Sequence, residues 1–240
     1  MDALKQAAAR AAVEQVQSDM VVGLGSGTTV AFAIQALGER IRQGRLRIVG
    51  VPTSYDTRIL AKACGIPICD TIDIDSVDIT IDGADEVDPA GNLIKGGGGA
   101  HVMEKLVAAL GRRFIVIVDE SKLVPTLGGG KYPVPVEVIA PALPFVMRCI
   151  QELGGRATIR NGSGKLGPVI SDLGHPIMNV DFGPIADAPR LSQQLDSIPG
   201  VVGHGLFIGM TDQVIVARSP AETPKVEVLH FARTARCGIR

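Results

Sequence analysis

The sequence predicts an α/β fold, in which a parallel sheet covered by helices is joined to a smaller α+β domain. Two observations carry this prediction. Up to Val118, segments with helical spacing alternate with short strands that are apolar almost throughout, which is typical of a sheet covered on both faces. After residue 127 the texture changes, since three glycines precede the Pro-rich segment 132–138. We expect one domain at residues 1–130 plus 201–240 and a smaller one at 131–200.

The elements expected in the first domain follow from local patterns. An Ala-rich stretch after Asp2, a favourable N-cap, predicts the first helix. Uniformly apolar runs of four or five residues predict strands, and apolar residues three and four positions apart predict helices. In order, we expect a helix at 3–17, a strand at 20–24, a helix at 29–43, a strand at 47–51, a helix at 55–64, strands at 66–68 and 77–81, a helix at 100–110 and a strand at 114–118.

The second half predicts an α+β pattern. The segment 132–138 alternates proline and valine and starts a strand. Further along we expect a helix at 141–153, strands at 156–160 and 168–172, a helix at 187–197, and strand-like segments at 201–208 and 213–217 that return to the first domain. No internal repeat or low-complexity segment interrupts the chain.

Composition limits the classes of function. With 240 residues, of which 46% are apolar, the chain can bury a full core. The formal net charge of −1 gives no electrostatic reason to expect nucleic acid or a membrane as a partner. The N-terminus lacks a secretory pattern and no long uncharged apolar run is present, so we expect a cytoplasmic protein. Its cysteines fit reduced, buried thiols: Cys64, Cys69, Cys149 and Cys237.

A glycine-rich turn follows the first predicted strand. Residues 23–29 read Gly-Leu-Gly-Ser-Gly-Thr-Thr and lead into a helix, where backbone N–H groups and hydroxyls can bind phosphate. The third glycine comes one position too early for the dinucleotide-binding pattern, and no Walker lysine follows. An ordinary strand-to-helix turn explains the same residues without a ligand, so this motif alone does not decide between them.

A second motif places acids after the strand 77–81. Residues 82–88 read Asp-Gly-Ala-Asp-Glu-Val-Asp. Asp and Gly are common turn residues, but Asp82 ends a buried strand, where an unpaired charge is costly. Ligands of parallel sheets bind beyond the carboxyl ends of the strands. We therefore expect the turn 25–29 and these acids to lie at one edge of the sheet, where carboxylates can bind sugar hydroxyls.

The third motif joins a cation to a run of backbone donors. Lys95 leads into Gly96–Gly99, and ordering four glycines is entropically costly unless the backbone must approach a ligand closely. Glu104 lies in the first turn of the following helix, where the helix dipole favours an acid without any function. The helical wheel puts Val102, Leu106, Val107, Ala109 and Leu110 on its apolar face and Glu104 off that face. The functional interpretation of Glu104 is a general base. Of the four scattered histidines, only His101 adjoins the glycine loop.

Taken together and in this order, the motifs resemble the ribose-5-phosphate isomerases of the A type. They are the segments 23–29, 51–54, 82–88, 95–99 with the Glu-Lys pair at 104–105, and 132–138. The resemblance implies interconversion of D-ribose 5-phosphate and D-ribulose 5-phosphate in the non-oxidative pentose phosphate pathway. It also implies a Rossmann-like catalytic domain, a ferredoxin-like smaller domain, no cofactor, no metal, and a homodimer or tetramer.

The resemblance also assigns roles to residues at matching positions. Glu104 matches the general base, and the other catalytic groups are Asp82, Asp85 and Lys95. The residues that match substrate-binding positions are Ser26, Gly27, Thr28, Thr29, Asp82, Gly83, Ala84, Asp85, Lys95, Gly96, Gly97, Gly98 and Lys131.

Other functions use similar folds. An amino-sugar-phosphate deaminase would be expected to rely on a histidine, and none is clearly placed. A CoA transferase would use a glutamate nucleophile, which Glu104 alone does not exclude. A non-catalytic sugar-phosphate sensor would need a DNA-binding module that the sequence does not supply. A dinucleotide-dependent oxidoreductase conflicts with the glycine spacing.

Overall fold

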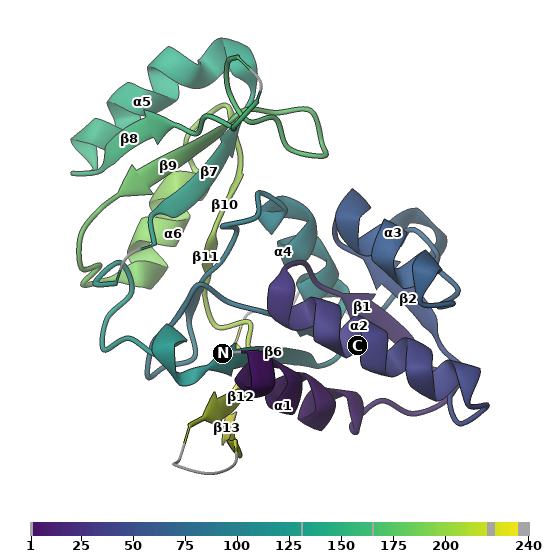
Figure 1. Cartoon of the computed structure of the whole chain (residues 1–240). Helices are drawn as coiled ribbons and strands as arrows, with labels where there is room; N and C mark the ends of the chain where they lie inside the picture. Colours follow the sequence, from purple (N-terminus) through teal and green to yellow (C-terminus); the bar gives the residue numbers. More distant parts are fainter. Residues whose placement is uncertain (1, 131, 165, 220–223, 235–240) are drawn as a thin grey trace. The chain divides into compact units, whose positions relative to one another are not determined.

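The fold was analysed in a computed structural model, which describes residues 2–130, 132–164, 166–219 and 224–234 (Figure 1). Contacts divide the chain into two compact units, each assembled from separate segments. The first contains Met1–Ala84, Met103–Leu123 and Gly209–Arg240, and the second contains Asp85–Val102 and Val124–Ile208. The division expected from the sequence instead kept residues 85–102, 124–130 and 201–208 with the first domain. The difference arises because residues 201–204 pair with the strand 134–138, residues 206–207 pair with 93–94, and the Leu127 carbonyl accepts from Ile185 N.

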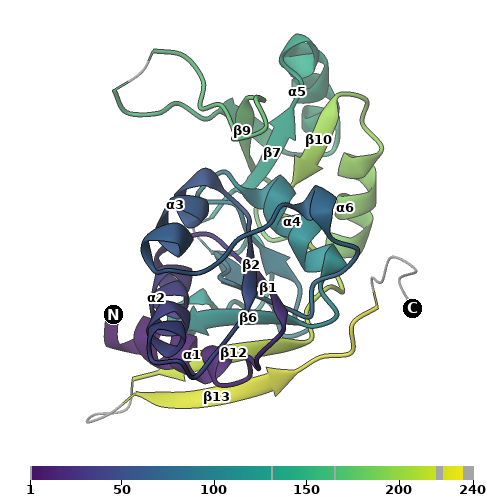
Figure 2. The same cartoon turned by 90° about the vertical axis from the view of Figure 1, so that its right-hand side faces the viewer.

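The first unit is built on a six-stranded sheet with the order β13-β12-β6-β3-β1-β2. Five of the strands are parallel, and β13 alone runs antiparallel, beside β12 (Figure 2). Apolar runs that are buried along most of their length form the inner strands. The bounds are β1 Val21–Leu24, β2 Val49–Pro52, β3 Ile79–Asp82, β6 Phe114–Asp119, β12 Gln213–Arg218 and β13 Lys225–His230.

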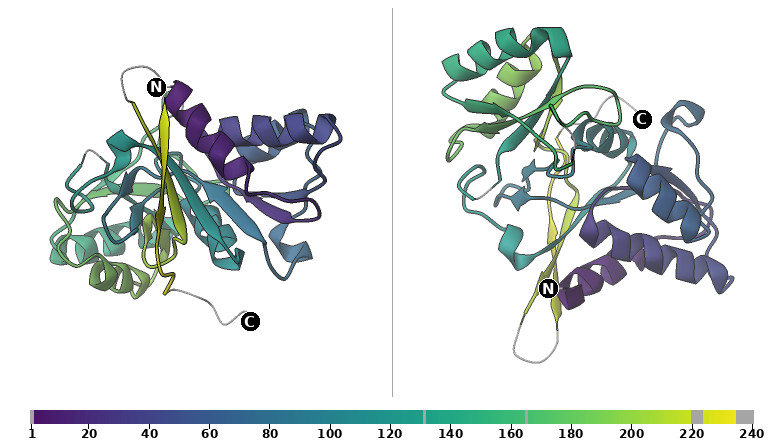
Figure 3. Two further views of the ribbon diagram at one scale, coloured as in Figure 1. Left: turned by 90° about the horizontal axis from the view of Figure 1, so that it is seen from below. Right: turned by 45° about the horizontal axis from the view of Figure 1, so that its top comes forward.

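Helices cover both faces of this sheet. On one face α1 (Asp2–Val13) and α2 (Thr28–Arg42) pack against each other, and with α3 (Tyr55–Ala63) they enclose the main core (Figure 3). On the other face α4 (His101–Leu110) sets Val107 against residues of β2 and the segment before β3. Alternation along β3 sends Ile79 and Ile81 to the first face, so Thr80 and Asp82 face the α4 side.

The second unit contains a four-stranded antiparallel sheet with the order β10-β7-β9-β8 and two helices. In chain order the elements alternate as β-α-β-β-α-β, which is the ferredoxin-like arrangement and confirms the expected class of fold. Valines of β7, together with residues of both helices, form its core. The bounds are β7 Val134–Val138, α5 Leu143–Glu152, β8 Arg156–Ile159, β9 Ile177–Asp181, α6 Ala188–Asp196 and β10 Val201–His204.

A small three-stranded sheet completes the second unit. It consists of β4 (Glu86–Val87), β5 (Leu93–Ile94) and β11 (Leu206–Phe207), with β5 in the middle. The sequence patterns predicted none of these as separate strands, since two-residue strands leave no periodicity to detect. The expected strand 201–208 divides at Gly205, where a Cβ atom would stand 2.1 Å from the Lys95 carbonyl oxygen.

Three further expectations differ from the structure. The strand expected at 168–172 is wrong, since this segment forms only isolated bridges and β9 comes later in the chain. The strand expected at 66–68 is reduced to one bridge between Gly50 and Ile68. The first helix ends at Val13 rather than residue 17. In the part of the chain that the structure describes, no helix combines the length and the apolar character needed to cross a membrane.

Candidate active site

Asp82 and the turn after β1 meet at the carboxyl edge of the first sheet, as the strand order predicts. Ser26 N donates to Asp82 Oδ1 over 3.2 Å, and Gly83 N donates to the same oxygen over 2.7 Å. Asp82 is fully buried. Two backbone N–H groups on one carboxylate oxygen fix the side chain in position.

Gly25 allows this close approach. A Cβ atom at residue 25 would lie 2.1 Å from Asp82 Oδ1 and 2.2 Å from Cγ. No side chain larger than hydrogen fits there unless Asp82 moves. The glycine therefore serves the carboxylate, and not only the turn.

A cluster of hydroxyls surrounds Ser26 at the same edge. Ser26 Oγ donates to Ser54 Oγ over 2.7 Å and lies 2.9 Å from Thr53 Oγ1, with which it shares a hydrogen bond. Thr57 Oγ1 donates to the Gly25 carbonyl over 2.7 Å. Sequence analysis did not propose Thr53, Ser54 or Thr57 as site residues. Their signal was present, because polar residues directly follow the buried strand β2.

The N-terminus of α2 carries the remaining predicted residues of this loop. Gly27 precedes the helix with φ 108°, which a residue with a side chain rarely adopts. Thr28 is exposed and its Oγ1 accepts from Lys5 Nζ of α1 over 2.9 Å, while Thr29 is half-buried. A lysine, a hydroxyl and a helix N-terminus together form a favourable environment for an anion.

Glu104 is buried on α4, with 4% of its surface exposed. This corrects the expected orientation of the helix: Leu106 is 44% exposed, whereas Val107 and Glu104 belong to the covered face. The helix α4 runs antiparallel to β3 and the segment before it. Val77 N donates to the Leu110 carbonyl, and further along the strand Thr80 Oγ1 donates to the Val107 carbonyl. The next turn of the helix therefore brings Glu104 toward the end of β3.

Asp85 belongs to the second unit and holds the glycine loop. Its Oδ2 accepts from Gly97 N over 2.8 Å. The loop closes as a turn in which Gly99 N donates to the Gly96 carbonyl over 2.9 Å, and Gly96 has φ 99°. Gly97 and Gly98 are exposed. Ala84 and Gly83 are half-buried in the link that leads to it from Asp82.

Arg160 is a further residue of this loop that sequence analysis missed. Its Nη1 donates to the carbonyls of Gly96 and Gly97, both over 3.1 Å. Burial lowers the pKa of the guanidinium, while the charge of Asp85 acts in the opposite direction. Nothing in a single sequence joins residues more than 60 positions apart, so no local signal could have found it.

Lys95 is buried beneath the same loop, with 2% of its surface exposed. Its Nζ lies 5.4 Å from the centre of the Phe207 ring, in cation–π geometry, and its backbone N–H donates to Gly205. His101 is fully buried and packs against the loop, since a Cβ atom on Gly96 would stand 2.7 Å from the His101 Cβ. His101 therefore supports the loop from within.

Glu86 directs its carboxylate to a different glycine loop. It is buried at the start of β4, and Oε2 accepts from Gly128 N over 2.7 Å, while Tyr132 N lies 3.4 Å from Oε1. Asp88 binds the turn between β4 and β5 and is a structural residue. Lys131, the expected substrate-binding lysine of the Gly128–Gly130 loop, lies outside the described residues.

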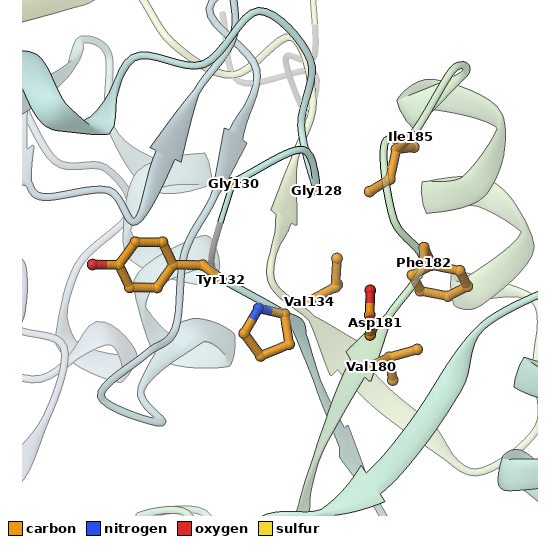
Figure 4. A pocket seen from close by; sticks show the side chains of 9 residues that line it. Gly128, Gly130, Tyr132, Val134, Val180, Asp181, Phe182 and Ile185 are labelled. Atoms are coloured by element: carbon orange, nitrogen blue, oxygen red, sulfur yellow. The ribbon is translucent and has the colours of Figure 1, made fainter.

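A pocket opens beside this second loop (Figure 4). Among the side chains that line it, Asp181 binds Arg156 and the Gly183 N–H. None of the described residues predicted to be catalytic lines this pocket. The lining residues are Gly128, Gly130, Tyr132, Pro133, Val134, Val180, Asp181, Phe182 and Ile185.

The fold and these residues define a class: an α/β protein whose parallel sheet ends in a buried carboxylate and a hydroxyl cluster, with a lysine and a glycine loop in a second unit. Residues 49–220 match the model of the family described as ribose 5-phosphate isomerase A (phosphoriboisomerase A). The chain belongs to this family.

Relatives align over nearly the whole chain. The ribose-5-phosphate isomerase A of Thermosynechococcus vestitus is 50% identical, covering 95% of this chain and 97% of its own. That of Haloarcula marismortui is 49% identical, covering 92% and 95%.

Solved structures agree with the fold. A D-ribose-5-phosphate isomerase in complex with phospho-erythronic acid has a TM-score of 0.91 at 42% identity, covering 95% of this chain and 98% of its own. The ribose 5-phosphate isomerase A of Methanocaldococcus jannaschii has a TM-score of 0.88 at 44% identity, covering 94% and 98%.

Proposed function

We propose that this chain interconverts D-ribose 5-phosphate and D-ribulose 5-phosphate. The observation that carries the proposal is the family membership over nearly the full chain, together with the buried carboxylates at the motifs that predict the chemistry. The reaction moves one proton between C2 and C1 and another between the two oxygens, through a cis-enediolate. This reaction belongs to the non-oxidative pentose phosphate pathway. We assign its steps to the predicted site residues described above.

Glu104 is the general base of this proposal. A carboxylate placed beside the C2–H bond takes that proton and returns it to C1, and such catalysis contributes on the order of 10² to 10⁴ in rate. Its burial on the sheet-facing side of α4 supports the role. A glutamate that only stabilised the start of the helix would stay exposed to solvent. The same carboxylate serves both steps, so no second base is required.

Negative charge develops on the C1 oxygen when the C2 proton leaves. Lys95 and the N–H groups of the glycine loop are suitable partners for that oxyanion, and losing one such donor costs roughly 3–4 kcal/mol. Asp82 and Asp85 bind hydroxyls and pass the proton between O2 and O1. Asp85 has a second task, since it also accepts from Gly97 N.

The phosphate is assigned to the start of α2. Thr28 with Lys5, and the first N–H groups of the helix, provide donors of the right kind. Both polar groups of Ser26 already bind inside the protein, so its role is to order the loop. Binding energy from this remote group fixes the reacting carbons against the base.

The test is NMR of the purified, EDTA-treated protein with D-ribose 5-phosphate in D₂O. We expect D-ribulose 5-phosphate to appear with deuterium at the reacting carbon. Deuterium uptake from the solvent would indicate an enediolate intermediate, and turnover after EDTA treatment would show that the reaction needs no metal that EDTA removes. Binding without turnover would favour the sensor function instead. If D-ribose 5-phosphate is neither bound nor converted, the assigned substrate is refuted.

A further inference from the structure

Protein groups hold one peptide unit of the glycine loop at both ends and the next unit at one end only. Each peptide unit carries a carbonyl and an N–H that point in opposite directions across a trans bond. In the unit joining Gly96 to Gly97, the carbonyl accepts from Arg160 and the N–H donates to Asp85. Both ends of this peptide are therefore fixed.

The next peptide unit is held at one end only. Its carbonyl, on Gly97, also accepts from Arg160 Nη1 over 3.1 Å. Its N–H, on Gly98, has no acceptor among the described residues. Gly98 is exposed, and a Cβ atom there would meet nothing within 4 Å. Arg160 thus turns a donor toward open space, where a ligand oxygen has room to lie.

Arg160 is itself anchored. It follows β8, and its Nε donates to Asn179 Oδ1 of β9 over 2.8 Å. A guanidinium that is fixed at Nε and binds two carbonyls at Nη1 orients their peptide planes. Its charge also polarises these peptides, which makes the opposite N–H groups stronger donors. Lysine would keep the charge but not the planar geometry.

We propose that Arg160 is a positioning residue of the isomerase, which holds the peptides from Gly96 to Gly98 so that the Gly98 N–H donates to the enediolate oxygen. This inference rests on the proposed function. The arginine acts through the loop and does not touch the substrate.

The test compares Arg160→Ala with Arg156→Ala. Arg156 lies on the adjacent strand β8 and pairs with Asp181 at the exposed surface, so it is a matched control. Arg160→Ala should lower kcat by about 10- to 100-fold, less than the 10²–10³ lost when an oxyanion donor is removed outright. KM should change by less than about threefold, because the interaction strengthens in the transition state. Arg160→Lys should recover part of kcat, and Arg156→Ala should match the wild type.

A binding measurement separates positioning from a merely structural role. Calorimetry should show that Arg160→Ala binds phospho-erythronic acid more weakly than the wild type does, because the planar carboxylate of this compound resembles an enediolate. Inorganic phosphate should bind as in the wild type. If Arg160→Ala does not fold, Asn179→Ala keeps the guanidinium but frees its Nε, and should lower kcat by a smaller factor.

Two outcomes overturn the proposal. One is a folded Arg160→Ala with kcat within about twofold of the wild type. The other is equal loss of phosphate and phospho-erythronic acid binding, which would mean that the arginine only maintains the fold. Failure of the proposed function is distinct, because then the wild-type protein itself would not turn over D-ribose 5-phosphate.

Discussion

Glu104 is buried, although burying an ionisable side chain costs free energy. We predict that Glu104→Gln folds normally and loses on the order of 10²–10⁴ in kcat, with little change in KM, because glutamine keeps the shape and removes the basic oxygen. Steady-state kinetics with D-ribose 5-phosphate measure the effect. Glu152→Gln, at the exposed end of α5, is the control. A Glu104→Gln enzyme with near wild-type kcat would remove Glu104 as the base.

Gly25 supplies a second test at the scale of one residue. Gly25→Ala places a methyl group 2.1 Å from Asp82 Oδ1, so the carboxylate must leave its position. We expect kcat to fall by at least about tenfold if Asp82 orients the reacting hydroxyls. Gly162→Ala is the control, since its Cβ meets only Val169 at an ordinary 3.5 Å. Equal kinetics for the two variants would separate Asp82 from catalysis.

At this scale the sequence predicts the residues that follow strands and misses those that arrive from elsewhere. Asp82 and Ser26 could be placed together because parallel strands end at one edge of a sheet. Arg160 could not, because its bonds to Gly96 and Gly97 depend on the tertiary fold. The orientation of α4 was predicted incorrectly, since the helical wheel counted Leu106 as buried and gave no weight to a covered Glu104.

At the scale of elements, the adjacent acids Asp85 and Glu86 bind different glycine loops. Glu86 is buried and accepts from Gly128 N. We predict that Glu86→Ala lowers the free energy of unfolding by about 1–3 kcal/mol, because it removes the buried carboxylate that accepts from the half-buried Gly128 N–H. Urea unfolding measures it, and Glu152→Ala is the exposed comparison. Equal stability of both variants would contradict this account of the loop.

The Arg156–Asp181 pair joins β8 to β9 and makes a pH-dependent contribution. Hydrogen bonding from the Gly183 N–H, and then from Arg156, lowers the pKa of Asp181. Because the folded pKa lies below the unfolded one, the stabilisation is complete above the ordinary value of 3.8 and is lost as pH falls through the folded pKa. The pair is largely exposed, so Asp181→Asn should cost less than about 1 kcal/mol at neutral pH.

Urea unfolding of Asp181→Asn and the wild type checks this expectation. The difference in stability should be constant at neutral pH and should close in acid below the folded pKa of the carboxyl. A difference that persisted unchanged into strong acid would contradict a charged Asp181 as its source.

Elements also show where sequence patterns lose their power. The segment 168–172 has strand composition, yet glycines and prolines flank it closely and β7 pairs with Ile177–Asp181 instead. The final strand β13 alternates apolar and polar residues, but its place at the sheet edge is decided by pairing with β12. Local composition therefore predicts that a segment is extended, while the ladder decides which segment joins the sheet.

At the scale of the whole molecule, the chain passes between the two units at 84/85, 102/103, 123/124 and 208/209. The helix α4 is continuous through one of these passages, since it begins at His101 and its residues from Met103 belong to the first unit. If the second unit unfolds, the first residues of this helix are no longer held. If the first unit unfolds, the segments of the second unit that are joined to it are released. We therefore predict that the two units unfold in one cooperative transition, although separate domains often do not.

Native-state hydrogen exchange with increasing urea provides the measurement. The slowest amides of β6 in the first unit and of β9 in the second should converge on one opening free energy, because both would exchange only through global unfolding. Two separate limits would show independent units, and the Glu86→Ala variant would then lower only the limit of β9. A single limit lowered equally by that variant in both strands would establish that a carboxylate in the second unit stabilises the sheet that carries Asp82.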